Sequence, residues 1–316
     1  MNLVKQGWSW LNDAPRHRTG ARILQVAVGL LIWFRLATEF RWASYFWGPH
    51  GLGYGDSRVV FGSWLGRHLD MAFHTELGTR AVLLLLGAAA LGLLTGRLTR
   101  LAAAAALVLE FMLETRLPEL LDGGDNITRI VLLYMVFLLP PRAAGRARGL
   151  GTFLHNVAVL AIGAQLCVVY LTAGFMKASG TRWSQGTALY LVSQVEWFSL
   201  PTSRWVFKNP VLTTFATYGT VFFQLWFPIV IFSRLKSLWV LIGVGLHVGI
   251  AYTMGLVPFS TVMIGLELFL IDDIEWQRFE TLAARLRERF AAAWRARVGA
   301  RRPVPGVVRD SGVEAP

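Results

Sequence analysis

The chain has 316 residues, of which 54% are hydrophobic and 16% charged, whereas roughly a quarter of the residues in soluble domains are charged. The formal net charge is +12, but the Lys and Arg residues cluster between hydrophobic blocks and near the C-terminus, as in the cytoplasmic loops of membrane proteins. The expected partner is therefore the lipid bilayer and not a nucleic acid. A single cysteine, Cys167, excludes an intrachain disulfide and a cysteine-based metal site.

Apolar runs long enough for a membrane recur along the chain. Taking about 20 residues for one span, we predict an all-α fold, a polytopic membrane bundle of eight helices over residues 21–272. Residues 1–20 form a cytoplasmic N-terminal segment. Glu39-Phe40-Arg41-Trp42 follows the first run where a signal peptide would carry small residues, so we expect an uncleaved span. The expected spans are 21–39, 79–97, 99–116, 125–141, 151–176, 210–233, 236–254 and 256–272.

The basic residues of the short loops predict the orientation. With an even number of spans they fall on one side, which we expect to be the cytoplasm, with both termini there, in the inner (plasma) membrane of a bacterium. Two longer aromatic loops, 40–78 and 177–209, then lie on the outer side. Within them, 57–70 and 184–198 could each form a short helix at the outer membrane face. A plain belt of interfacial aromatic residues is an equally good interpretation of any one aromatic.

The C-terminal part changes character. From Glu275 to Arg297, large apolar residues recur at three- and four-residue spacing, and the arginines lie mostly elsewhere. This pattern predicts a basic amphipathic helix over 273–298 that lies on the anionic cytoplasmic leaflet. The remaining residues, 299–316, have the composition of a disordered tail.

Several ionisable residues fall inside the expected spans, where each requires a partner, a watery cavity or an interfacial position. Arg35/Glu39, Glu110/Glu114 and Asp125/Arg129 are each four residues apart and share a helix face. The short loop 117–124 makes Glu110 or Glu114 a plausible partner for Arg129. One interpretation is that ion pairs fix helix packing, and Glu39 and Glu267 could simply reach an interface. The full set is Arg35, Glu39, Glu110, Glu114, Asp125, Arg129, Lys177, His247 and Glu267.

The densest cluster of informative residues ends the fifth expected span. Tyr170, Gly174 and Lys177 lie on one helical face, and Gly174 allows another backbone to approach. A lysine at an apolar helix end is more often an interfacial anchor than a base. If it is desolvated, however, it can act as a general base.

This stretch resembles a known family. Ala173-Gly174-Phe175-Met176-Lys177, then Arg182-Trp183 and Gly186, resemble the Ala-Gly-x-x-Lys…Trp…Gly stretch of the vitamin K-dependent γ-carboxylase membrane domain. The wider set is the HTTM (horizontally transferred transmembrane) superfamily, which includes SdpB-type proteins that accompany peptide toxins. Three further stretches resemble that layout: Trp47-Gly48-Pro49-His50-Gly51-Leu52; Gly124-Asp125-Asn126 with Arg129; and His247 with Gly255-Leu256-Val257-Pro258-Phe259.

The resemblance implies a site and a cofactor. It makes Lys177 a base acted on by a reduced, vitamin K-like quinone and oxygen, and it makes His247 a second catalytic residue. The large extramembrane C-terminal region of the carboxylase has no counterpart here, so quinone-linked or peptide-directed chemistry at the outer face is the broader expectation. No metal is predicted. The residues expected to line the pocket are Asp125, Asn126, Arg129, Tyr170, Gly174 and Trp183.

A second hypothesis is a non-enzymatic, SdpB-like maturation or export partner. It would bind a secreted peptide toxin, or a small membrane or periplasmic partner, through the outer aromatic loops. A third hypothesis, a transporter, has less support, because the sequence lacks paired helices broken by Gly or Pro in two matching halves. A Gly-x-x-x-x-Gly-Lys-Ser/Thr phosphate loop and a His-Glu-x-x-His motif are also absent from the sequence.

Overall fold

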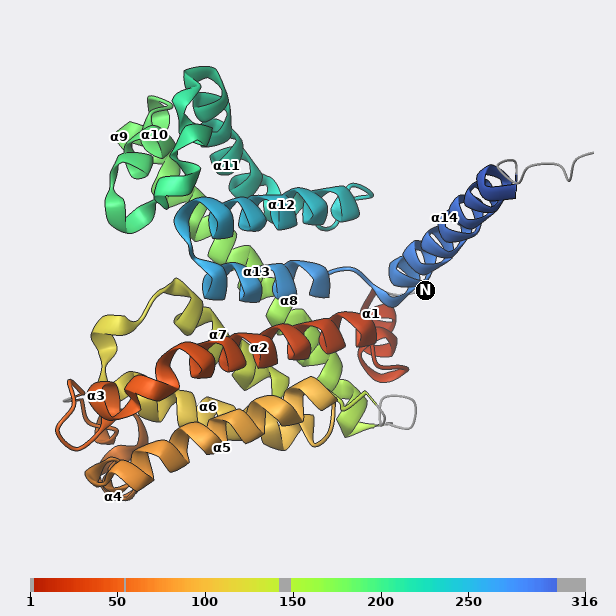
Figure 1. Ribbon diagram of the computed structural model, residues 1–316. Helices are drawn as coiled ribbons and strands as arrows, with labels where there is room; N and C mark the ends of the chain where they lie inside the picture. Colours follow the sequence, from red (N-terminus) through yellow and green to blue (C-terminus); the bar gives the residue numbers. More distant parts are fainter. Residues whose placement is uncertain (1–2, 54, 142–148, 300–316) are drawn as a thin grey trace, which may run out of the picture. The chain divides into compact units, whose positions relative to one another are not determined.

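The protein is α-helical throughout the part of the chain that the computed structural model describes, residues 3–53, 55–141 and 149–299 (Figure 1). The chain divides into one compact unit that ends at Asp273 and a second unit that begins at Ile274. The helices are α1 Leu3–Asn12, α2 Arg18–Glu39, η1 Phe40–Trp42, α3 Ala43–Trp47, α4 Arg58–Asp70, η2 Met71–His74, α5 Glu76–Thr95, α6 Thr99–Arg116, η3 Pro118–Leu120, α7 Gly123–Met135, α8 Leu150–Ala178, α9 Thr181–Ser184, α10 Ala188–Gln194, η4 Glu196–Phe198, η5 Pro201–Lys208, α11 Pro210–Val230, α12 Lys236–Met254, α13 Val257–Phe269 and α14 Asp273–Gly299.

Four stretches of the described residues are long and apolar enough to cross a membrane: Arg18–Trp47, Glu76–Thr95, Leu150–Ala178 and Lys236–Met254. Each of the eight expected spans falls on a helix, but α7 and α13 have 13 residues each. At 1.5 Å per residue such a helix is about 20 Å long, which is shorter than a hydrocarbon core of about 30 Å. The protein is thus all-α with four candidate spans, which makes an integral membrane protein possible.

The helix α7 shows why the predicted boundary at residue 141 is wrong. Its regular part ends at Met135, and the chain then tightens, because Phe137 N–H donates to Tyr134 O and Leu138 N–H to Met135 O. The guanidinium of Arg100 donates to the carbonyls of Phe137 and Leu138. These bonds satisfy groups that an ending helix leaves unpaired, just before Pro140-Pro141.

Local sequence also sets the other ends. Asp122 and Asp125 form a capping box at the start of α7: Asp122 Oδ1 accepts from Asp125 N at 3.1 Å, and Asp125 Oδ2 accepts from Asp122 N at 2.9 Å. At α5, Thr75 caps the start by accepting from Gly78 N. Gly96, at φ 69°, ends the same helix in the left-handed conformation, which glycine adopts without steric cost.

The helices of the first unit pack in a continuous series. Helix α2 packs against both α5 and α13, α5 packs against α6, and α6 packs against α7, while α8 packs against α11 and α12 against α13. Small residues permit the closest approach: a Cβ on Gly20 of α2 would lie 2.5 Å from the carbonyl oxygen of Phe269 in α13. Gly265 of α13 is equally close to α2, where its Cβ would meet Ala27 at 2.7 Å.

Asn156 of α8 attaches the N-terminal segment to this bundle. Its side-chain amide donates to the carbonyls of Trp10, Leu11 and Ala14 at 2.9–3.2 Å, and its oxygen accepts from Arg16 N at 2.9 Å. Asn156 is fully buried, so these bonds replace the water that it would otherwise bind.

The loops expected on the outer side are partly helical. Helix α4 covers the predicted 57–70, with a break at Gly62, where φ is 78°. Within 184–198 the structure has the short α10 followed by the 3₁₀ turn η4, so the helix expected there is shorter than the predicted range. The expected 273–298 helix lies within α14, and the predicted tail lies, beyond Gly299, outside the described residues.

Candidate functional site

A cavity of about 640 Å³ lies among α8, α9, α10, α11, α12 and α13. Its wall is mostly apolar, with Val169, Phe223, Leu246, Ile250 and Phe259 among the lining residues. Four of the residues predicted from the sequence also line it: Tyr170, Lys177, Trp183 and His247. Small-molecule sites typically have volumes of about 300–1,000 Å³ and largely apolar walls.

Three polar side chains meet at the Tyr170 end of this wall. The hydroxyl of Tyr170 donates to Glu267 Oε1, and its oxygen lies 3.0 Å from His247 Nε2. Because the one hydroxyl hydrogen is given to Glu267, His247 must donate from Nε2–H to Tyr170. Nδ1 of His247 has no hydrogen-bond partner within the described residues.

Glu267 was expected either to need a partner or to reach an interface, and the second alternative is wrong. It is fully buried in α13, and its Oε1 lies 3.7 Å from His247 Nε2. Gly243 of α12 makes room for it, since a Cβ there would overlap the Glu267 carboxyl group. The sequence indicated that Glu267 needs a partner, because it is an acidic residue in an otherwise apolar helix. It did not indicate that Tyr170 is that partner.

Lys177 occupies the last turn of α8, where it is half-buried. Its Nζ lies 5.3 Å from the centre of the Trp183 ring and 3.5 Å from the carbonyl oxygen of Ala173. A cation over a tryptophan face is stabilised by the ring quadrupole. The side chain that the family resemblance makes a base therefore lies beside an aromatic ring on the cavity wall.

Gly174 has a packing role next to this site. A Cβ on Gly174 would lie 2.9 Å from Leu225 and 3.2 Å from Gln224, both in α11. Glycine thus allows α8 and α11 to approach closely, as predicted. Gln224 itself lines the cavity and was missed from the sequence; its Oε1 is buried without a hydrogen-bond partner in the described part of the chain.

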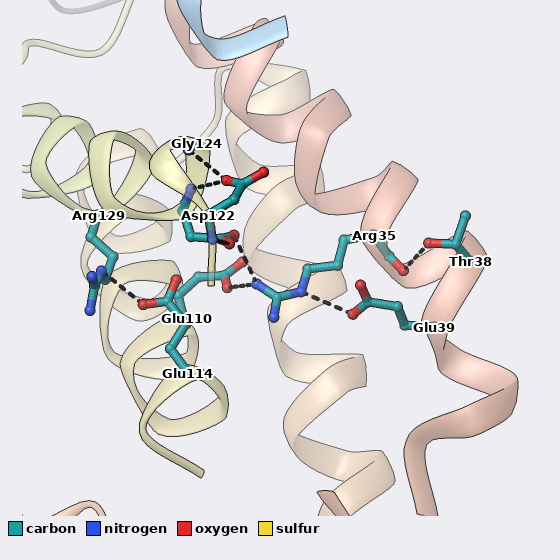
Figure 2. Close-up of polar contacts among 9 residues, drawn as sticks. Arg35, Thr38, Glu39, Glu110, Glu114, Asp122, Gly124 and Arg129 are labelled. Atoms are coloured by element: carbon teal, nitrogen blue, oxygen red, sulfur yellow. Dashed lines mark hydrogen bonds and ion pairs between the residues drawn. The ribbon is translucent and has the colours of Figure 1, made fainter. Parts of the chain in front are cut away.

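The remaining predicted site residues belong to a separate charged cluster (Figure 2), formed by α2, α6 and α7. Arg35 pairs with Glu110 at 2.7 Å, with Glu39 at 3.0 Å and with Asp125 at 3.7 Å. On the other side, Arg129 Nε lies 2.8 Å from Glu114 Oε2, and its Nη2 lies 3.4 Å from the side-chain oxygen of Asn126. The expected pairs Arg35/Glu39 and Arg129/Glu114 are confirmed.

This charged cluster is largely shielded from solvent. The side chains of Glu110 and Glu114 are each 2% exposed, and Arg35 and Arg129 lie over the rings of Trp47 and Phe111. Removing one member of such a pair leaves a buried charge without compensation. The geometry therefore favours the interpretation of these pairs as groups that hold three helices together. Asp125, Asn126 and Arg129 do not line the cavity.

No group of three or more His, Cys, Asp or Glu residues suited to a metal ion occurs in the described residues. The polar side chains of the cavity wall include the amine of Lys177, the phenol of Tyr170, the imidazole of His247 and the amide of Gln224, together with hydroxyl groups such as that of Ser193. These groups can bind and orient a ligand and can accept or donate protons.

The chain is similar to a protein of Bacillus subtilis (strain 168) named Uncharacterized protein YitO, with 27% identity over 175 residues. The match covers 49% of this chain and 55% of the relative, so the chain spans about half the length of the protein that it matches. No family model matches the chain. No solved structure matches it either.

Proposed function

We propose that the protein is a membrane enzyme that performs quinone-linked or peptide-modifying chemistry at the outer face, with Lys177 as its base. The observation that carries the proposal is that Lys177, Tyr170, Trp183 and His247 line one cavity, although three different segments supply them. The resemblance to the vitamin K-dependent γ-carboxylase membrane domain pointed to Lys177, Trp183 and His247. It also pointed to Asp125, Asn126 and Arg129, which do not line this cavity.

The wall of the cavity fits a reduced quinone in its chemistry. Such a molecule has an aromatic head and, in its natural forms, an apolar tail, which match Phe223, Phe259 and the aliphatic lining residues. A reduced quinone would supply two electrons and two protons to an acceptor such as oxygen. Phenol, imidazole and amide groups beside an apolar wall are suited to orienting its hydroxyl groups.

The residues of the chain divide the work in this proposal. Lys177, half-buried beside Trp183, takes up a proton from the ligand at Nζ. A poorly solvated amine loses its own charge more readily, and the neutral amine can then accept that proton. Glu267 fixes the Tyr170 hydroxyl, which in turn fixes Nε2 of His247. His247 is thereby held in one orientation against the ligand space.

Quinol-dependent oxygen uptake by the reconstituted protein tests the proposal. We expect uptake with menaquinol in vesicles, and a loss of at least about a hundredfold in Lys177→Gln, since one acid–base group contributes about 10²–10⁴-fold. Lys208→Gln, a change at an exposed lysine of η5, is the matched control and retains full uptake. Equal uptake by Lys177→Gln and the native protein would remove Lys177 as the base.

A non-enzymatic, SdpB-like partner of a secreted peptide or a small membrane or periplasmic protein is the second candidate. It is favoured by large aromatic side chains that stand exposed on the loops expected at the outer face: Trp64 at 68%, Trp197 at 90% and Trp205 at 63%. Exposed aromatic groups are common in the centres of protein interfaces. A stoichiometric peptide or subunit that co-purifies from native membranes, with no quinol-dependent uptake, would favour this function.

The topology proposed for either function has eight spans, both termini in the cytoplasm and the outer loops outside a bacterial plasma membrane. The two short helices, α7 and α13, are then extended across the bilayer by their flanking turns. Single cysteines at Ser9 and Trp197, introduced into a Cys167→Ser chain, test this arrangement in intact cells. A reagent that cannot cross the membrane is expected to label position 197 and not position 9.

A further inference from the structure

Helix α14 carries a surface that the proposed function does not use. It runs from Asp273 to Gly299, which corresponds to about 40 Å at 1.5 Å per residue. Five of its large apolar side chains are between 41% and 74% exposed: Phe279, Leu282, Leu286, Phe290 and Trp294. Exposed apolar side chains that form one continuous patch mark an interaction surface.

The five side chains form one stripe along the helix. At 100° per residue, Leu282 and Trp294 mark the two edges of an arc of about 120°, with the other three between them. Two-stranded coiled coils use a narrower seam of leucine or β-branched residues. The width of this stripe and its aromatic content therefore fit the surface of a lipid bilayer better than the narrow face of a second helix.

Arginines border the stripe on both sides. Arg278, Arg285 and Arg289 lie within about 60° of the Leu282 edge, and Arg287 lies about 20° beyond the Trp294 edge, at 100° per residue. Residues 274–295 contain five arginines and three glutamates, a formal charge of +2. Basic residues at the borders of an apolar stripe place their charges at the level of lipid phosphates when the stripe is buried in the acyl layer.

We propose that α14 lies flat on a bilayer surface and selects anionic lipids. The apolar stripe enters the acyl boundary, and the bordering arginines pair with phosphate groups of the headgroups. This role is independent of the cavity, since it depends on residues of α14 alone.

Limited trypsin digestion of the whole protein in nanodiscs tests this proposal. Discs expose both membrane faces, so the result does not depend on the orientation of the chain. We expect cleavage after Arg285, Arg287 and Arg289 to be at least about fivefold slower in discs with phosphatidylglycerol than in discs of phosphatidylcholine alone, because anionic lipids strengthen binding of basic segments. The difference should shrink at about 1 M salt, where the Debye length is about 3 Å.

Two triple variants separate the stripe from the rest of the helix. Leu282→Ser/Leu286→Ser/Phe290→Ser should lose the protection and be cleaved at the same rate in both kinds of disc. The control variant Gln277→Ser/Ala284→Ser/Ala292→Ser also introduces three serines, but on the side of α14 opposite the stripe. It should keep the protection from trypsin. Equal cleavage of the native protein in both discs, or protection that survives loss of the stripe, would overturn the proposal. Protection that instead rises with protein concentration in phosphatidylcholine would identify a second copy of the chain as the partner and overturn it too.

Discussion

The hydroxyl oxygen of Tyr170 lies 3.0 Å from Nε2 of His247, a residue 77 positions further along the chain. The contact joins α8 to α12 at the wall of the cavity, and the Tyr170 hydroxyl simultaneously donates to Glu267 of α13. Three helices are therefore held at one buried oxygen atom. A ligand in the cavity would therefore contact an imidazole whose orientation is fixed by Tyr170 and, through it, by Glu267.

Replacing Tyr170 with Phe should destabilise the protein by about 1–3 kcal/mol, the cost of leaving buried polar groups without their partner. The change removes one oxygen atom and keeps the ring, which packs 4.2 Å from the Phe227 ring between centroids. Thermal unfolding in detergent measures the loss. Tyr252→Phe, at an exposed tyrosine of α12, is the control and should change stability by less than about 0.5 kcal/mol. Equal effects of the two changes would contradict the buried hydrogen bond.

The pair Arg129/Glu114 should show strong energetic coupling. Each single alanine variant is expected to lose about 3–5 kcal/mol, because the remaining charge is buried without its partner. The double variant should lose less than the sum, and a cycle of the four proteins measures the difference. The pair Arg58/Asp56, whose side chains are 55% and 32% exposed, should show much weaker coupling. Additive losses at Arg129 and Glu114 would show that the pair contributes no coupling.

Asn156→Leu should release the N-terminal segment. The leucine cannot donate to the carbonyls of Trp10, Leu11 and Ala14 or accept from Arg16, so the N-terminal segment loses four of its hydrogen bonds to α8. Amide hydrogen exchange should rise in residues 3–16 while α5 and α6 remain protected, since local openings follow local contacts. Asn12→Leu is the comparison. It lies on the same segment, its side-chain amide donates to the carbonyl of Trp8, and the change should leave exchange at the amides of Ala14 and Arg16 unaltered. Unaltered exchange in Asn156→Leu would contradict the attachment.

His17 should make stability depend on pH. Burial lowers the pKa of His17 below its ordinary value of 6.5, and Nδ1–H donates to the carbonyl of Phe269 at 2.9 Å. As the pH falls through about 6.5, His17 therefore binds a proton in the unfolded chain but not in the folded chain. The contribution of His17 to the free energy of unfolding is present above that pH and is lost as the pH falls below it.

His17→Asn isolates this contribution. Asparagine can donate to Phe269 and tolerates the left-handed conformation found at His17, where φ is 50°, but it does not titrate. Between about pH 7.5 and pH 5.5, a window that contains the ordinary histidine pKa, the unfolding temperature of the native protein should fall more than that of the variant. Parallel pH profiles would show that His17 does not contribute.

The sequence predicted a large part of this arrangement because the signals were local. Apolar runs predicted every long helix of the first unit, and four-residue spacing predicted the Arg35/Glu39 pair. The loop 117–124 was short enough to predict a partner for Arg129 on the neighbouring helix. The face shared by Tyr170, Gly174 and Lys177 follows from helical periodicity alone.

Contacts between distant helices were not accessible in the same way. The sequence placed Arg129 and His247 in one pocket, whereas they lie in two separate sites, because nothing local encodes which helices become neighbours. The partners of Glu267 were not predicted, and Gln224 was overlooked, for the same reason: these contacts exist only when α13 and α11 lie against α8. The end of α7 was misplaced because apolar residues continue after the regular hydrogen bonds stop.

The most direct test is to identify what occupies the cavity. Gly249 of α12 lines it, and a Cβ there would meet no atom within 4 Å, so the backbone can carry the side chain of Gly249→Leu at the cavity wall. Gly151→Leu, on α8 and outside the cavity lining, is the matched control. Mass spectrometry of extracts from the purified protein should find a near-stoichiometric isoprenoid quinone with the native chain and with Gly151→Leu, and a loss of at least about tenfold with Gly249→Leu, since a filled pocket excludes its ligand. Absence of a quinone from the native protein, or equal amounts in all three, would contradict a quinone site in this cavity.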